Sequence, residues 1–265
     1  MSLKIATWNV NSIRIRIDGL KNLIDKVNPD IVCIQEVKAK ESDFPSEEIK
    51  NLGYGHIALN SMAGYNGVAI LSKLPLKNIE AHSWCGKADA RHIKADVGDI
   101  EINNIYIPAG GDIPDININP SFAHKLKFID ELALYFRKNK EKYQNKKLVL
   151  CGDFNVAPLE NDVWGHKEMQ KTVSHTPIEV LKITSLQSSL NLINVIRKIY
   201  PEPQKVYSWW SYRNPNWKTN DKGRLLDHIW VTQALNDYIE SVTILKEQRT
   251  SERPSDHVPI ILKIR

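Results

Sequence analysis

Short apolar runs that end in polar residues recur along the chain and define its predicted strands. The clearest is residues 147–151, Lys-Leu-Val-Leu-Cys, which predicts a strand buried on both faces. Asp153 and Asn155 follow this run, and Pro158 then ends the strand. Since side chains at i and i+2 of an extended chain point the same way, Asp153 and Asn155 should project together. Both residue types are also ordinary turn formers, so only a repeat of this pattern elsewhere favours a functional interpretation.

The pattern does repeat. Further strands are predicted at residues 4–10, 30–34, 68–71, 91–97, 100–107, 225–231 and 258–264. Apolar residues at helical spacing predict helices at residues 13–27 and 121–142, and a helical region in two pieces at 176–200. We find no linker, low-complexity segment or short repeat in the sequence. Strands interrupted by helices and hairpins therefore predict one α/β domain, residues 1–265, with mixed sheets.

Composition narrows the class of protein. Of 265 residues, 42% are hydrophobic and 25% charged, which is typical of a folded globular chain. The formal net charge of +5 permits an anionic partner without requiring one. Three cysteines without metal-ligand spacing predict buried free thiols in a reducing compartment. The first residues lead directly into a strand, without a signal peptide or an apolar run long enough to span a bilayer, so we expect a soluble cytoplasmic protein.

The polar residues at the predicted strand ends point to one kind of chemistry. They are Asn9, Glu36, Tyr106, Asp153 with Asn155, Asp227, and Asp256 with His257. In a layered fold these ends share one rim, where four carboxylates would repel one another unless a cation compensated them. Carboxylate and amide oxygens suit Mg²⁺ or Mn²⁺, whereas one histidine is too few for a typical zinc site. A divalent cation beside a basic surface indicates phosphate chemistry.

Six motifs carry a resemblance to a known family. They are Trp8-Asn9-Val10-Asn11, Gln35-Glu36-Val37-Lys38, Tyr106-Ile107-Pro108, Gly152-Asp153-Phe154-Asn155, Leu226-Asp227 and Ser255-Asp256-His257. Each is weak alone, but their order and spacing resemble the endonuclease/exonuclease/phosphatase superfamily over essentially the whole chain. Within it, the chain resembles the exonuclease III family of abasic-site DNA endonucleases. The resemblance implies a four-layered α/β sandwich, in which two mixed β-sheets pack face to face with helices outside.

The resemblance also implies roles for these residues. The implied metal ligands are Glu36 as the principal ligand, with Asn9, Asn11, Asp153, Asn155, Asp256 and His257. The implied catalytic residues are Tyr106, Asp153, Asn155, Asp227 and His257. Asp153 resembles the residue that deprotonates the attacking water, although some family schemes give this task to His257, and the sequence leaves the choice open. Asp227 would orient His257, and the Tyr106 phenol would bind the phosphate or assist the leaving group.

The implied reaction is Mg²⁺-dependent hydrolysis, with Mn²⁺ as the alternative ion, of the phosphodiester 5′ to an abasic site in duplex DNA. It leaves a 3′-hydroxyl, and 3′→5′ exonuclease and 3′-phosphodiesterase activities accompany it. The partner would be double-stranded DNA with abasic sites or 3′ ends, bound by a monomer at the cytoplasmic nucleoid and not at a membrane. Residues at DNA-binding positions are Asn11, Arg14, Lys38, Tyr65, Arg91 and Trp209. For Trp209 the alternative is a core position, since paired aromatics are usually core. His228 should face away from Asp227 and be structural.

The sequence departs from the family pattern at two places, and two alternative functions remain open. Ala109 and the pair Arg224-Leu225 differ from the pattern of many family members, which bears on substrate preference. One alternative is another phosphoesterase of the superfamily, acting on inositol phosphates, sphingomyelin or RNA, which would share the same catalytic residues. The motif Tyr106-Ile107-Pro108 argues against this alternative, because relatives acting on lipids or undamaged DNA commonly carry a histidine nearby. A non-catalytic binding module should have lost Glu36, Asp153 or His257, and this sequence retains all three.

Overall fold

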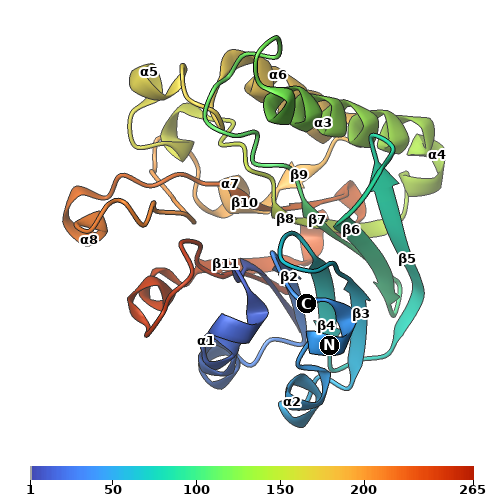
Figure 1. Ribbon diagram of the computed structural model, residues 1–265. Helices are drawn as coiled ribbons and strands as arrows, with labels where there is room; N and C mark the ends of the chain where they lie inside the picture. The colour runs from blue at the N-terminus through green and yellow to red at the C-terminus, as the bar shows by residue number, and fades with distance from the viewer. Residues whose placement is uncertain (1) are drawn as a thin grey trace.

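Two six-stranded β-sheets form the centre of the computed structural model, which describes residues 2–265 (Figure 1). In the first sheet the strand order is β11-β12-β1-β2-β4-β3, and in the second it is β5-β6-β7-β8-β10-β9. The strands of the first sheet are β11 (Ile239–Ile244), β12 (Ile260–Ile264), β1 (Leu3–Asn9), β2 (Ile31–Gln35), β4 (Val68–Ser72) and β3 (His56–Asn60). Those of the second sheet are β5 (Leu76–Trp84), β6 (Lys87–Val97), β7 (Ile100–Tyr106), β8 (Lys147–Asp153), β10 (Asp227–Val231) and β9 (Ile193–Asn194).

One pair of parallel strands lies at the middle of each sheet, and the remaining neighbours are antiparallel. β1 runs parallel to β2, with Asn9 beside Gln35, and β7 runs parallel to β8, with Tyr106 beside Asp153. Because parallel strands end at the same edge, each pair delivers its last residues to one place. β10 is antiparallel to β8, and its first residue, Asp227, pairs with Asp153.

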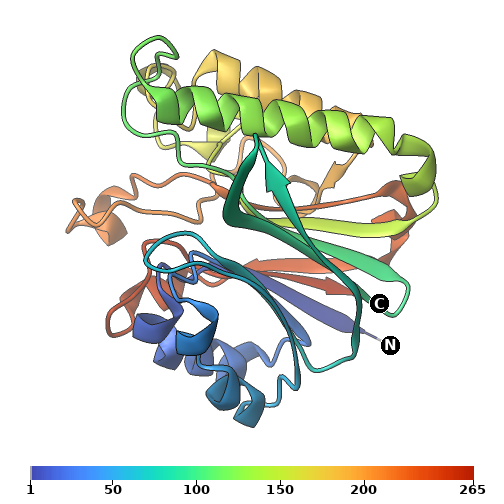
Figure 2. The same ribbon diagram turned by 45° about the vertical axis from the view of Figure 1, so that its right-hand side comes forward.

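The two sheets pack face to face, and helices cover their outer faces, so the chain forms four layers (Figure 2). α1 (Ile13–Val27) and α2 (Ser46–Asn51) pack outside the first sheet, and α3 (Pro120–Lys138) and α6 (Pro177–Ser189) outside the second. The shorter helices are α4 (Lys140–Tyr143), α5 (His166–Met169), α7 (Val195–Ile199) and α8 (Trp217–Asn220). The four-layered sandwich expected from the sequence is confirmed.

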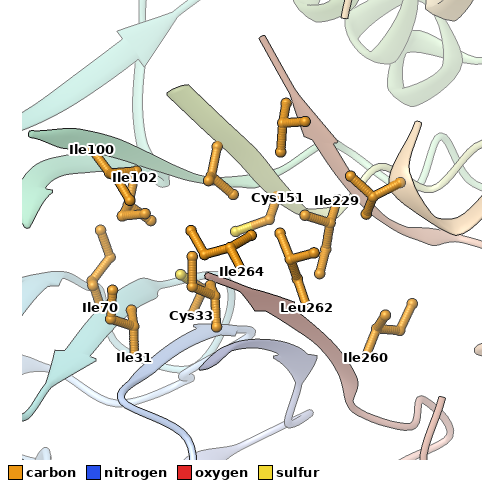
Figure 3. Packing of buried hydrophobic residues seen from close by; sticks show 14 of the residues in the cluster. Ile31, Cys33, Ile70, Ile100, Ile102, Cys151, Ile229, Ile260, Leu262 and Ile264 are labelled. Atoms are coloured by element: carbon orange, nitrogen blue, oxygen red, sulfur yellow. The ribbon is translucent and has the colours of Figure 1, made fainter. Parts of the chain in front are cut away.

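The layer between the sheets is made mainly of branched aliphatic side chains (Figure 3). Ile31 and Ile70 from the first sheet lie across from Ile100 and Ile102 of the second, and Leu262 of the first lies near Ile229 of the second. Alternate residues of the same strands face the helices, so central strands such as β2, β4 and β8 are buried on both faces, as their continuous apolar runs predict.

The cysteines follow the prediction in part. Cys33 and Cys151 are buried between the sheets, whereas Cys85 is half-buried, and all three are free thiols.

Element boundaries differ from the sequence predictions in several places. The region predicted as helical at residues 176–200 contains α6 and α7, but the short strand β9 lies between them, and α2 was not predicted. The helix predicted to reach residue 142 ends at Lys138, since Asn139 has a non-helical backbone, and α4 follows as a separate turn. Strands β3, β5 and β11 were not predicted; β5 and β11 lie at sheet edges with many exposed residues, so they lack a continuous apolar run. No helix within residues 2–265 has the length and apolar character needed to cross a membrane.

Candidate active site

The polar ends of the central strands meet at one edge of the sandwich, where Asn9 joins the two sheets. The Asn9 side-chain nitrogen donates to Glu36 Oε1 at 2.8 Å and to Asp153 Oδ2 at 2.9 Å. Its oxygen accepts the backbone N–H of Asn11 at 3.0 Å, which fixes the orientation of the amide. Asn9 comes from β1 and Asp153 from β8, so this one amide connects a carboxylate of each sheet.

Glu36 collects donors from three directions. Besides Asn9, the Tyr106 hydroxyl donates to Glu36 Oε1 at 2.9 Å, and Lys38 Nζ lies 2.6 Å from Glu36 Oε2. Lys38 Nζ also donates to Asn11 Oδ1 at 2.7 Å. Burial raises the Glu36 pKa, but the hydrogen bonds from Lys38 and Asn9 outweigh it and hold the pKa below its usual value. Burial and the neighbouring carboxylates, Glu36 first, raise the pKa of Tyr106, so its phenol stays protonated as a donor.

A histidine lies between two carboxylates on the other side of Asp153. His257 Nδ1 donates to Asp227 Oδ2 at 2.8 Å, and His257 Nε2 faces Asp153 Oδ2 at 3.6 Å. Burial alone would lower the pKa of His257, but the charges of Asp227 and Asp153 raise it to about 10. The ring is therefore an imidazolium at neutral pH.

Asp153 has the electrostatic character of a base that works near neutral pH. Burial raises its pKa to about 7, and the negative charges of Asp227 and Glu36 add to this, while His257 and the hydrogen bond from Asn9 oppose it. A carboxylate poised near the operating pH is efficient in general base catalysis. Its Oδ1 accepts the Asn155 backbone N–H at 2.9 Å, which fixes the carboxylate plane.

Sharp backbone turns aim these side chains at one point. Glu36, Lys38 and Asn155 have φ values of 52°, 52° and 53°, in the left-handed region that L-residues rarely adopt. Such conformations persist only where the surroundings enforce them, and they concentrate at functional sites. Asn155 donates its side-chain nitrogen to Ile107 O at 2.8 Å, which leaves its side-chain oxygen for the site.

The donor set fits a hard divalent cation. Asp153, Asp227 and His257 offer ligand atoms within 4.8 Å of one another, but both ring nitrogens of His257 already face the carboxylates of Asp227 and Asp153. The better ligands are Glu36 and the oxygens near it, because Glu36 is ionised and only partly buried. Asp256 also stays ionised: burial opposes this, but the charge of His257 and the hydrogen bond from Trp209 hold its pKa below the usual value.

The site opens into a cavity of about 650 Å³ that both acidic and basic side chains line. The polar residues of the strand ends in its lining are Glu36, Tyr106, Asp153, Asn155, Asp256 and His257. Two cations in the lining contact aromatic rings: the Arg224 guanidinium lies 4.9 Å from the ring of Trp209, and Lys222 Nζ lies 4.5 Å from the ring of Trp164. Trp209 Nε1 donates to Asp256 Oδ2 at 2.9 Å, which links the two groups of residues.

The structure thus brings together all eight strand-end residues predicted from the sequence: Asn9, Glu36, Tyr106, Asp153, Asn155, Asp227, Asp256 and His257. Asn11, Lys38, Arg91 and Trp209 lie in direct contact with this set. Arg14 and Tyr65 do not line the cavity; both are exposed, and Arg14 lies 4.0 Å from Asp43. Trp210 is core, and buried His228 donates to Val156 O, away from the cavity, as predicted.

Several supporting residues were missed. The Ser208 hydroxyl donates to Asp227 Oδ2 at 2.6 Å, Trp8 Nε1 donates to His257 O at 3.0 Å, and Ser255 Oγ donates to Asn9 O at 2.7 Å. Lys125 of α3 is fully buried and donates to Asn155 O at 2.7 Å. Trp8 and Ser255 stand inside the motifs, which was an available signal, but nothing around Ser208 or Lys125 in the sequence marks them.

A two-sheet sandwich with carboxylates, amides and an imidazolium gathered around one cavity at the sheet ends defines a class of phosphate-ester hydrolase. Residues 6–257 match the Endonuclease/Exonuclease/phosphatase family. The chain belongs to this family and is a phosphodiester hydrolase.

The relatives are nucleases. The chain is 32% identical to exodeoxyribonuclease III of Haemophilus influenzae, over 97% of this chain and 98% of that protein. It is 29% identical to DNA repair nuclease APEX1 of Danio rerio, over 98% and 82% of the two chains.

Solved structures of DNA-processing enzymes are also similar to this chain. The 3′ phosphatase NExo from Neisseria, bound to a product DNA hairpin, superposes with a TM-score of 0.91 at 29% identity and covers 99% of both chains. An AP endonuclease from Archaeoglobus fulgidus gives 0.89 at 29% identity over 98% of both chains.

Proposed function

We propose that the protein is a DNA-repair nuclease that hydrolyses the phosphodiester 5′ to an abasic site in duplex DNA and leaves a 3′-hydroxyl. The observation that carries this is the position of His257, whose ring lies between Asp227 and Asp153 and faces the same cavity as the Tyr106 hydroxyl. A cation, a protonated phenol and a carboxylate base around one space are what in-line attack on a phosphodiester requires. The exonuclease III and AP endonuclease relatives support a DNA substrate.

Each side chain has one task in this reaction. Asp153 takes a proton from water as the water oxygen attacks phosphorus, because it is the carboxylate with the raised pKa. His257 keeps its proton and donates to the phosphoryl oxygen, where negative charge increases. The bond from phosphorus to the 3′ oxygen breaks, and Tyr106 donates to the phosphate or to the leaving oxygen. Asn155 holds the water or a phosphate oxygen.

Glu36, with Asp256 and the neighbouring amide oxygens, would hold Mg²⁺, or Mn²⁺ in its place; when bound, the ion would supply polarisation of a phosphoryl oxygen and stabilisation of the leaving group. Asn9 has its nitrogen toward Glu36 and Asp153, so its part is to hold these two carboxylates together. The proposal retains a single domain over the whole chain, the monomer and the cytoplasmic nucleoid expected from the sequence.

A second activity, removal of phosphate groups from DNA 3′ ends, is favoured by Arg224. Its guanidinium donates to Ser174 Oγ at 2.9 Å and to Val173 O at 3.2 Å, so its hydrogen bonds go to neutral oxygens. Stacked on Trp209 in the cavity wall, it presents a positive charge that suits an anionic terminal group. The relatives named 3′ phosphatase and 3′-5′ exonuclease support this activity.

The test uses a labelled duplex with one tetrahydrofuran abasic analogue, beside an intact duplex and a duplex ending in a 3′-phosphate, each with and without Mg²⁺. We expect one incision 5′ to the analogue, a product that a polymerase can extend, and release of inorganic phosphate from the third duplex. No incision of the abasic strand with Mg²⁺, or equal cleavage of the intact duplex, would reject the main proposal. Full activity in EDTA would reject its metal dependence.

A further inference from the structure

Arg91 is not a free surface cation, although its place in the family pattern implies a contact with DNA phosphate. Its side chain is only 13% exposed, and its Nε donates to Asp89 Oδ2 at 2.6 Å. The Asp89 side chain is only 17% exposed, so this buried carboxylate already neutralises most of the positive charge of Arg91. A phosphate contact requires an accessible cation, and Arg91 offers little of one.

The guanidinium instead lies on the ring of Tyr106. Its central carbon is 4.7 Å from the ring centroid, and Nη1 donates to Tyr106 O at 3.4 Å. The strand register explains this contact: His92 of β6 pairs with Ile105 of β7, so the next residues, Arg91 and Tyr106, are cross-strand neighbours. A planar cation stacked on the ring, with a second contact to the same residue's carbonyl, restricts rotation of the phenol.

The Asp89 end of the ion pair is fixed by a loop that also holds Glu36. Asn66 donates its side-chain nitrogen to Asp89 O at 2.9 Å, and Gly67 donates its N–H to the next carbonyl, Ala90 O, at 3.1 Å. The carbonyls of Asn66 and Gly67 accept the backbone N–H groups that follow Glu36, from Lys38 at 2.9 Å and Val37 at 3.0 Å. Gly67 is required here, because a β-carbon would lie 2.9 Å from Val37 Cβ and its φ is +91°.

We propose that Arg91, anchored by Asp89, is a positioning residue that holds the Tyr106 phenol toward Glu36 and the cavity. This inference rests on the proposed function, in which the Tyr106 hydroxyl acts on the phosphate. The loop at residues 64–67 contacts both the segment after Glu36 and the Asp89–Arg91 segment, and so fixes the two relative to each other. The same loop therefore helps to position both the Tyr106 hydroxyl and the Glu36 carboxylate that accepts its hydrogen bond. Arg91 thereby acts through Tyr106 and not through DNA.

The test is a double-mutant cycle of R91K and Y106F on the abasic duplex. Lysine keeps the charge, and with it any phosphate contact, but lacks the planar fork that stacks and binds Asp89. We expect R91K to lower single-turnover kcat about tenfold, or about 1.4 kcal/mol, with little change in KM. In the Y106F background the same change should cost less than about twofold, because coupled residues are non-additive.

A second variant and a salt titration complete the test. D89N should lower kcat as much as R91K does, and this loss should also disappear in the Y106F background. The control is R137K on the exposed face of α3, which should match wild type. Replacing Arg91 with glutamine should leave the salt dependence of DNA affinity unchanged, whereas loss of a phosphate contact lowers the slope of log K against log salt by about 0.9.

Additive losses in the cycle, a raised KM at constant kcat, or a reduced salt slope would each overturn the positioning role. Wild-type kcat in Y106F alone would overturn it too, since Tyr106 would then have no task to be positioned for. Failure of the wild-type protein to incise the abasic duplex would reject the proposed function itself, and this inference with it.

Discussion

At the scale of single residues, a cationic side chain lies against three carboxylates of the site. Lys38 pairs with Glu36, and His257 lies between Asp227 and Asp153. A buried carboxylate costs several kcal/mol unless it is compensated, so these pairings allow the negative groups to lie together. Burial raises the pKa of Asp153 to about 7, and the charges of Asp227 and Glu36 add to this rise. The carboxylate whose pKa lies near neutrality is the one proposed as the base.

The first prediction concerns that base. Asp153→Asn keeps the size of the side chain but cannot accept a proton, so single-turnover incision should slow by about 10²–10⁴-fold while DNA affinity changes little. Rapid-quench incision assays and fluorescence anisotropy measure the two quantities. Asp25→Asn on the exposed side of α1 is the control. A rate for the Asp153 variant near that of the control would show that another group removes the proton.

The second prediction concerns metal binding and has a readout other than activity. Mg²⁺ at about ten times its Kd should stabilise the native state by about 1.4 kcal/mol and raise the thermal midpoint. Glu36→Gln should abolish most of this gain, while exposed Glu47→Gln should retain it. Scanning calorimetry with and without EDTA makes the comparison. Equal Mg²⁺ stabilisation of wild type and Glu36→Gln would remove Glu36 from the ligand set.

At the scale of elements, the parallel pairs β1–β2 and β7–β8 do most to build the site, because they deliver their last residues to one edge. Loops with left-handed residues then turn the chain sharply at Glu36 and Asn155. The site is therefore anchored in strands buried on both faces, which hold side chains more accurately than loops do.

Gly152 allows β7 and β8 to approach closely just before Asp153, which gives the third prediction. It has φ +138°, and a β-carbon there would lie 1.9 Å from Ile105 O. Gly152→Ala should therefore lower the free energy of unfolding by at least about 3 kcal/mol. Gly55→Ala, where a β-carbon meets nothing within 4 Å, should be nearly neutral. Urea denaturation of both variants measures the difference, and similar midpoints for the two would contradict this account.

The fourth prediction is a pH dependence of stability that arises in β10. Burial lowers the pKa of His228 to about 4, although its hydrogen bond to Val156 O opposes this. The unfolded chain has the ordinary pKa near 6.5, so it binds the proton first as the pH falls. The contribution of neutral His228 is complete above about pH 6.5 and is lost between there and about pH 4, by about 3 kcal/mol.

Urea midpoints measured from pH 7 to pH 4 test this. His228→Gln should make the decline less steep without removing it, because burial also lowers the pKa of His92 to about 3. Replacing exposed His56 with glutamine should leave the decline unchanged. A decline of the same steepness in the His228 variant would assign the acid sensitivity to other groups.

At the scale of the whole molecule, charge and cavity shape decide what can bind. The net charge of +5 is modest, but Lys222 and Arg224 line the same cavity as the acidic groups. Exposed Arg14 on α1 extends positive charge beyond the cavity, so a DNA backbone that crosses the site can follow it.

The fifth prediction tests this path. The affinity for abasic duplex should fall linearly with log salt, and Arg14→Ala should lower the slope by about 0.9, the amount for one phosphate contact. Anisotropy titrations at several salt concentrations give the slopes, with Lys263→Ala on β12 as the control. An unchanged slope for Arg14→Ala would place Arg14 outside the DNA path.

The correct and incorrect sequence predictions have physical causes. The helix at Ile13–Val27 and the strands ending at Asn9, Tyr106 and Asp153 were predicted well, because burial on one or both faces leaves a strong apolar pattern. Edge strand β5 was missed because most of its residues are exposed. Arg91 illustrates the limit for the site: its residue type indicates a surface cation, but only strand register puts it on the ring of Tyr106.

The sequence by itself determined the order of strands and helices and the polar residues at the strand ends, because periodicity and residue type are local properties of the chain. The four layers were implied by the resemblance to the family. Only the tertiary structure decided which groups share protons and charge. That Asn9 connects Glu36 to Asp153, that His257 lies between two carboxylates and that Arg224 stacks on Trp209 depends on distances between residues far apart in the chain. Electrostatic coupling falls off with distance and depends on burial, and the packing of the two sheets sets both.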